Sequence, residues 1–307
     1  PRSTRKESSA ASDVYKRQNK YNAKTGALEK TLFEEKNDRW VEPEHPVYFV
    51  NDNQFVWMSE RDGFMNLYLY DDQGALVRKL TENKWVAQEI IGHDTEGNVY
   101  YQGTGANGME THAFKVNLKS GKQEQLTSGE GTHHVSFSSD YTLMYDQMSS
   151  NYIPNKETIY DLSKGKMLRE VLVAANPYDG VVMGKAEIGT IKAADGKTDL
   201  NYRLIKPSNF DPKKKYPVLV YVYGGPHAQL ITNSWLGGAS LWMYWMAEQG
   251  YLVYTLDNRG SANRGFEFES VIHRQLGTAE MADQMEGVKH LKSLPYVNAN
   301  RLAVHGW

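Results

Sequence analysis

The feature that most constrains the fold is a repeat in the first half of the chain, where a polar turn closed by glycine follows an apolar strand four times. The closing glycines are Gly26, Gly74, Gly121 and Gly165, which lie 48, 47 and 44 residues apart. Alternating aromatic and β-branched segments such as Gln54–Met58 lie between the turns. A period of about 40 to 50 residues with several short strands is typical of β-propeller blades. The repeat predicts the C-terminal blades of a propeller over residues 19–175.

An antiparallel β-sandwich with similar hairpins is the alternative to this interpretation. Glycine turns are common in both architectures, whereas three near-equal spacings favour the propeller. A closed propeller usually contains more blades, so we expect the propeller to be truncated on its N-terminal side. Residues 1–18 mix Ser, Ala, Arg and Lys without periodicity, and we expect them to be a disordered or non-native leader.

After residue 180 the pattern changes from repeated turns to alternating strands and helices. The dipeptide Asp195-Gly196 predicts a hairpin turn between strands at Glu187–Lys192 and Leu200–Ile205. The segment Tyr216–Tyr223 is almost continuously apolar, as strands buried on both faces are.

Four further elements follow in the sequence. They are a core helix at Ser240–Gln249, a buried strand at Tyr251–Leu256, an amphipathic helix at Thr278–Leu294 with Met281, Met285 and Val288 on one face, and a last buried strand at Arg301–His305. Hairpin, strand, helix, strand, helix and strand is the opening order of an α/β-hydrolase domain. The expected fold class is therefore mixed, with a partial all-β propeller followed by an incomplete α/β-hydrolase domain at residues 180–307.

The composition of the chain argues against several classes of function. The 307 residues carry a net charge of −2, which gives no reason to expect a nucleic-acid partner. Apolar stretches are only strand-length, so we expect no transmembrane segment in this chain. The absence of cysteine excludes disulfides and thiolate chemistry but leaves the compartment open. We expect no cofactor.

The last residues point to nucleophilic catalysis. A strand that runs into Gly306-Trp307 fits the first two positions of a G-x-S-x-G nucleophile elbow, with the serine position following Trp307. Upstream, the Tyr223 hydroxyl at a strand end could donate a hydrogen bond to an oxyanion, and Gly224 and Gly225 would let the backbone approach a substrate. The alternative is a Gly-Gly-Pro turn beside a packed aromatic side chain. We expect a fragment that ends before its nucleophile and is inactive alone.

Other polar residues are expected to be structural. Arg259 follows a buried strand and is predicted to brace its loop through Asp257 or Glu267. His305 lies within the last strand and is predicted to be a core histidine. The pair His133-His134 lacks further ligands at metal spacing, so we predict no metal site.

Several segments resemble the dipeptidyl peptidase IV branch of the prolyl oligopeptidase family, particularly its bacterial members. They are Ser59-Glu-Arg-Asp-Gly-Phe64, Tyr216-Pro-Val-Leu-Val-Tyr-Val-Tyr-Gly-Gly-Pro226, Asp257-Asn-Arg-Gly-Ser-Ala-Asn-Arg-Gly265, Arg274-Gln-Leu-Gly-Thr-Ala-Glu280 and Arg301-Leu-Ala-Val-His-Gly-Trp307. Their occurrence in one order extends the resemblance over nearly the whole chain from about Asn19.

The resemblance implies a serine exopeptidase that releases N-terminal dipeptides, often with proline or alanine before the cut. It implies that Tyr223 completes the oxyanion hole, that Gly306 and Trp307 precede the nucleophile, and that Trp40 lines the substrate cleft. The triad serine, aspartate and histidine would all follow Trp307, and the glutamates that bind the substrate amino terminus would precede residue 1. Peptide substrates, a periplasmic or secreted location and a possible homodimer are further implications.

The alternative function is a non-catalytic interaction protein built from a propeller and a hydrolase-like domain. The residue that follows Trp307 in the gene distinguishes the two hypotheses. Serine at that position favours the enzyme, and any other residue favours the binding module.

Overall fold

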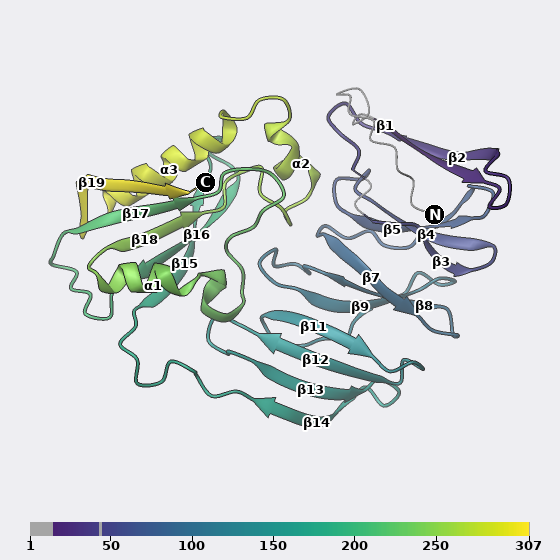
Figure 1. Ribbon diagram of the computed structural model, residues 1–307, viewed down its shortest axis with the longest axis horizontal. Coiled ribbons are helices and arrows are strands. Elements are labelled where there is room, and N and C mark those ends of the chain that lie inside the picture. The colour runs from purple at the N-terminus through teal and green to yellow at the C-terminus, as the bar shows by residue number, and fades with distance from the viewer. Residues whose placement is uncertain (1–14, 43–44, 307) are drawn as a thin grey trace.

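A computed structural model of the chain describes residues 15–42 and 45–306. The strands β1 to β14 form an arc of small sheets, and the later elements form a second, mixed sheet with helices (Figure 1). The strands of the arc are β1 Tyr15–Tyr21, β2 Leu28–Lys36, β3 Tyr48–Asn51, β4 Gln54–Ser59, β5 Asn66–Asp71, β6 Leu76–Lys79, β7 Ala87–His93, β8 Asn98–Gly103, β9 His112–Asn117, β10 Gln123–Gln125, β11 Thr132–Phe137, β12 Leu143–Ser149, β13 Lys156–Asp161 and β14 Lys166–Val173.

The arc contains three four-stranded antiparallel sheets, β3 to β6, β7 to β10 and β11 to β14, each paired in sequence order, and the two-stranded sheet β1-β2. The glycines of the repeat close equivalent hairpins: Gly74, Gly121 and Gly165 each precede the fourth strand of a sheet, and Gly26 connects β1 to β2. All four have positive φ angles, from 59° to 84°, which glycine adopts at no steric cost. These four-stranded units confirm the predicted propeller blades.

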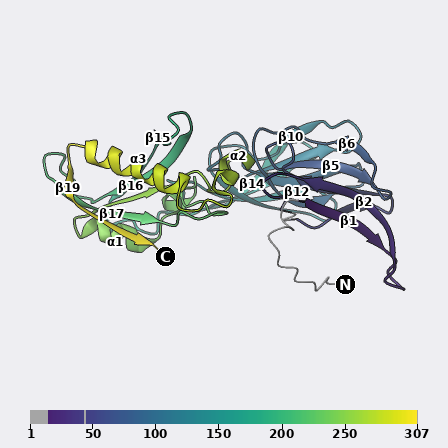
Figure 2. The same ribbon diagram turned by 90° about the horizontal axis from the view of Figure 1, so that it is seen from above.

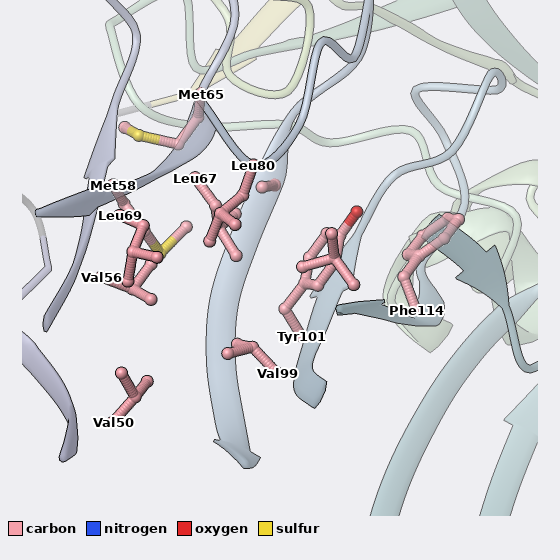
Figure 3. Packing of buried hydrophobic residues seen from close by; sticks show 12 residues of the cluster. Val50, Val56, Met58, Met65, Leu67, Leu69, Leu80, Val99, Tyr101 and Phe114 are labelled. Carbon is pink, nitrogen blue, oxygen red and sulfur yellow. The ribbon is translucent and has the colours of Figure 1, made fainter. Parts of the chain in front are cut away.

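Adjacent blades share an apolar core (Figure 3). Leu67 and Leu69 of β5 belong to the same buried cluster as Val99 and Tyr101 of β8. Because strand side chains alternate between faces, each blade can present one set of these residues to its neighbour. Packing between blades therefore positions the loops at their edges.

The start of the described chain differs from the predicted leader over residues 1–18. Residues 1–14 lie outside the described residues, whereas Tyr15 to Gln18 belong to β1, which pairs with β2. The pairing places Arg17 opposite Glu34, and their side chains form an ion pair. The sequence did not predict this strand, because its side chains are polar and exposed and neither face shows an apolar pattern.

The second part is a five-stranded sheet in the order β15-β16-β18-β17-β19. Its elements are β15 Lys185–Lys192, β16 Asp199–Lys206, β17 Tyr216–Val222, the 3-10 helix η1 Trp235–Gly238, α1 Leu241–Glu248, β18 Leu252–Leu256, α2 Phe266–Glu269, the 3-10 helix η2 Ser270–Ile272, α3 Ala279–Ser293 and β19 Val297–Gly306. The strand β17 runs parallel to both β18 and β19, whereas the β15-β16 hairpin is antiparallel.

The helices α1 and α3 lie on opposite sides of the sheet (Figure 1). Met243 and Ala247 of α1 join a buried cluster with Val253, and Leu291 of α3 joins a different cluster with Val218. A mixed sheet covered by helices confirms the predicted α/β class for this part. None of the helices in the described residues is long and apolar enough to cross a membrane.

The apolar face predicted for the amphipathic helix exists, but it is largely exposed rather than buried in the core. The helix α3 buries Glu280, Asp283, Gly287 and Leu291, whereas Met281 and Met285 are exposed. Its contacts with the sheet are partly polar, because Asp283 binds groups from two neighbouring segments. The exposed methionines line an open groove of about 480 Å³ beside β17 and β19.

The last strand also differs from its prediction. Most side chains of β19 are exposed, including His305, which is therefore not a core histidine. The strand is the outer one of the described sheet and pairs only with β17. The His305 ring instead packs against Trp242, with ring centroids 5.1 Å apart, and Tyr221, at 5.9 Å.

Candidate functional site

Two of the residues predicted to carry chemistry, Tyr223 and Gly306, lie at the carboxyl ends of two adjacent parallel strands. Tyr223 directly follows β17, and the register pairs Val222 of β17 with Gly306 of β19. Sites in α/β sheets lie at this edge because the strands end there and loops begin. A Cβ atom on Gly306 would lie 2.1 Å from the Val222 carbonyl oxygen, so this close approach requires glycine. Trp307 lies outside the described residues.

The loop after β17 has a conformation that depends on glycine. Gly224 has a φ of +75°, and a Cβ on Gly225 would lie only 3.0 Å from Cε1 of the Tyr223 ring. The ring therefore lies over the Gly225 backbone. Tyr223 is 48% exposed, and its hydroxyl has no hydrogen-bond partner among the described residues. The ring thus packs on the glycine turn, as the alternative expects, while the partly exposed hydroxyl remains available as a donor.

The helix α2 lies between the propeller strands and the second sheet (Figure 2), and Trp40, which follows β2, contacts Phe266 of this helix. Its ring contacts Phe266 edge-on, with centroids 5.7 Å apart, and lies 5.4 Å from the His273 ring. A cavity of about 150 Å³ beside Trp40 is also lined by His227 and Glu269. The predicted cleft residue thus comes from the propeller side and reaches the loops of the second part.

Arg259 braces its loop, but with partners that differ from those predicted. Its Nε and Nη2 donate to Asp283 at 2.9 Å each, and its Nη1 donates to Asp195 at 3.1 Å. Asp283 is fully buried and also accepts the Ala194 backbone N–H. The expectation of Asp257 or Glu267 as the partner is therefore wrong. Asp283 shares a helical face with Gly287 and Leu291, at i+4 and i+8, and this spacing was the available signal.

Asn233, which the sequence reasoning missed, docks the second part onto the propeller. Its backbone N–H donates to the Met109 carbonyl at 2.7 Å, and its Nδ2 donates to Glu110 at 2.8 Å. Its carbonyl accepts the Thr132 hydroxyl at 3.1 Å, and its Oδ1 accepts the Asn151 N–H at 3.2 Å. No local pattern could reveal this residue, because all four partners lie far away in the chain.

Two predicted structural residues lie away from this edge. His133 is buried, and its Nδ1 lies 2.9 Å from Asp146, whereas His134 on the same strand is exposed. His133 thus has an internal partner in the propeller.

Asp257 anchors the segment that leads toward Asn233. Its carboxylate accepts the N–H groups of Leu230 at 2.9 Å and Ile231 at 3.0 Å. Burial nevertheless raises the pKa of the Asp257 carboxyl from 3.8 to about 6, because desolvation outweighs these hydrogen bonds and the charges of Arg203 and Arg264.

The raised pKa predicts how stability depends on pH. Folding favours the protonated carboxyl, so its stabilising contribution is complete below about pH 4 and is lost as the pH rises through 6. From pH 7 to pH 5 we expect the unfolding free energy of the wild type to rise by about 1 to 1.5 kcal/mol relative to Asp257→Asn, which does not titrate. Urea unfolding of both proteins at the two pH values measures this difference. A difference that stays constant or falls would contradict the assignment.

A propeller arc docked onto a mixed sheet, with an exposed tyrosine and paired glycines at the carboxyl edge, defines a propeller-linked protein of the α/β-hydrolase class. Comparison with family models places the chain more closely. Residues 8–155 match the N-terminal region of dipeptidyl peptidase IV, and residues 239–307 match the prolyl oligopeptidase family. The chain belongs to the prolyl oligopeptidase family, in its dipeptidyl peptidase IV branch.

Individual relatives agree with this placement. The structure of a candidate dipeptidyl aminopeptidase IV from Bacteroides ovatus is 40% identical in sequence, with a TM-score of 0.91. The match covers 96% of this chain and 45% of the Bacteroides protein. Porphyromonas gingivalis dipeptidyl peptidase 4 is 28% identical with a TM-score of 0.86, over 96% of this chain and 42% of that one. Human dipeptidyl peptidase 8 is 26% identical over 90% of this chain and 35% of its own length. The chain thus spans less than half the length of these relatives.

Proposed function

We propose that the chain is part of a serine exopeptidase of the dipeptidyl peptidase IV type, which releases N-terminal dipeptides with proline or alanine before the cut. The observation that carries the proposal is the position of Tyr223 at the carboxyl end of β17, directly beside Gly306 at the end of β19. A nucleophile on the turn that follows such a strand would lie next to the tyrosine hydroxyl.

The proposed chemistry is acyl transfer through a covalent acyl-enzyme. Attack of a serine hydroxyl on the scissile carbonyl places negative charge on the carbonyl oxygen in the tetrahedral intermediate. The Tyr223 hydroxyl would donate to this oxygen, together with a backbone N–H of the turn that follows Gly306. Because the donor is fixed before the charge develops, it stabilises the transition state more than the substrate. Tyr223 is 48% exposed and its hydroxyl has no hydrogen-bond partner in the described part of the chain, which supports this role.

The junction of the two parts supports a peptide substrate. Trp40 of the propeller side lies against Phe266, so an aromatic side chain is available where the two parts meet. A peptide that enters between the parts could pack an apolar side chain or a proline ring on such a surface. The proposal therefore assigns Trp40 to the wall of the substrate cleft.

The activity is tested with the protein expressed from its complete gene. We expect turnover of Gly-Pro-p-nitroanilide and Ala-Pro-p-nitroanilide, which a serine-directed phosphonate abolishes. An N-acetylated Gly-Pro substrate serves as the control and should not be cleaved, because an exopeptidase of this type requires a free amino terminus. Cleavage of the acetylated substrate at a similar rate would contradict the exopeptidase assignment. If none of the substrates is cleaved, the proposal that the protein is a peptidase is contradicted.

The 307-residue chain by itself gives a separate prediction. We expect it not to hydrolyse these substrates, because an oxyanion donor without an adjacent nucleophile and base supplies only part of the catalytic set. The measurement compares the purified chain with the product of the complete gene at equal concentration. Phosphonate-sensitive turnover by the chain alone would show that its residues contain a complete site.

A further inference from the structure

The loop that carries Tyr223 contains a histidine in an unusual backbone conformation, four residues after the tyrosine. His227 has a φ of +58°, in the left-handed region that residues other than glycine rarely adopt. It follows Pro226, whose ring fixes the preceding φ angle. Such a conformation persists only where the surrounding structure holds it, and these positions are frequent at functional sites.

Glu269 holds His227 from within the second part. A single carboxylate oxygen, Oε1, lies 3.2 Å from the His227 backbone N–H and 2.8 Å from its Nδ1. The backbone N–H donates to this oxygen, and Nδ1 forms an ion pair with it when the ring is protonated. The Glu269 side chain is only 16% exposed. This part of the loop is therefore held through both the backbone and the side chain of His227.

A second carboxylate reaches the same ring from the propeller side. Glu42 Oε2 lies 3.5 Å from His227 Nε2, and the Trp40 ring is 6.4 Å from the His227 ring. Both residues belong to the segment that follows β2. His227 thus contacts the propeller with one edge of its ring and the second part with the other.

We propose that His227 is a positioning residue for the proposed reaction, which aims the Tyr223 hydroxyl by fixing the loop through Glu269 and Glu42. The path is short: His227 sets the position of Pro226, and the adjoining Gly225 backbone lies under the Tyr223 ring. The contact between the propeller and the second part would thus influence the position of the Tyr223 hydroxyl through the His227 side chain. This inference rests on the proposed function and adds a residue to it.

Hydrogen exchange tests the ordering role without relying on activity. In the protein expressed from its complete gene, we expect His227→Ala to raise amide exchange severalfold in a peptide that covers residues 220–230. His227→Asn should restore most of the protection, because Asn tolerates this conformation and its Nδ2 can donate a hydrogen bond to Glu269. The exposed His134→Ala serves as the matched control. Unchanged exchange in His227→Ala would overturn the proposal.

Kinetics with Gly-Pro-p-nitroanilide test whether His227 acts through Tyr223. We expect His227→Ala to lower kcat by roughly 10-fold to 50-fold with KM within about twofold, because a small displacement of the donor is felt mainly in the transition state. In a Tyr223→Phe background, the same change should cost less than about twofold. An equal further loss there would overturn the proposal. If Tyr223→Phe alone leaves kcat unchanged, the proposed oxyanion role fails, while hydrogen exchange still decides whether His227 orders the loop.

Discussion

Tyr223→Phe in the protein expressed from its complete gene is expected to lower kcat by roughly 10² to 10³-fold, with little change in KM. Loss of one oxyanion donor typically has an effect of this size, because the hydrogen bond strengthens as charge develops in the transition state. Phenylalanine retains the ring that lies over Gly225, so the loop keeps its main contact. The measurement is kcat and KM for Gly-Pro-p-nitroanilide, together with a thermal melt.

A matched control is Tyr152→Phe. Tyr152 is highly exposed in the propeller, so removal of its hydroxyl should change neither kcat nor the melt. Wild-type kcat with an unchanged melt in Tyr223→Phe would remove Tyr223 from the catalytic residues. A lower kcat with a large fall in Tm would instead indicate that the hydroxyl contributes mainly to folding.

The largest expected effect on stability is that of Asp283→Ala. The substitution leaves the Arg259 guanidinium without its buried partner and removes the acceptor of the Ala194 and Arg259 backbone N–H groups. Removal of one member of a buried ion pair typically costs about 3 to 5 kcal/mol, because the remaining charge stays desolvated. We expect a loss of this size in the unfolding free energy, measured by urea unfolding.

Glu286→Ala on the same helix is the control for this change. Within the described ranges, Glu286 pairs only with Lys289, one turn away on the surface, and such pairs contribute about 0.2 to 0.5 kcal/mol. The contrast between the two variants separates the buried network from general effects on α3. Equal and small losses in both variants would show that Asp283 does not hold the Arg259 loop.

The sequence predicted the propeller well because its signal is local. Each repeat glycine closes one hairpin at positive φ, and the spacing of these hairpins reports the size of a blade. The elements of the second sheet were found for a similar reason. Long apolar runs such as β17 and the Asp195-Gly196 turn identify strands and a hairpin without any knowledge of tertiary contacts.

The failures concern polar residues whose partners are distant in the chain. The helix α3 turns Asp283 inward because Arg259 and Ala194 meet it there, and an apolar pattern cannot report such a contact. Asn233 and His227 were missed on the same grounds, since their partners come from the propeller or from α2. His305 was misplaced because its exposure depends on which strands surround β19. Tyr223 could be proposed from sequence because strand, glycines and family resemblance coincide within a few residues.

The central claim is that Tyr223 supplies an oxyanion donor. The most direct measurement is a crystal structure of the protein expressed from its complete gene, inactivated with a Gly-Pro phosphonate that forms a tetrahedral adduct with the nucleophile. The account predicts that Tyr223 Oη lies about 2.7 to 3.1 Å from the phosphonyl oxygen that replaces the oxyanion. A Tyr223 hydroxyl that points away from a well-defined adduct, with that oxygen bound by other donors, would contradict it.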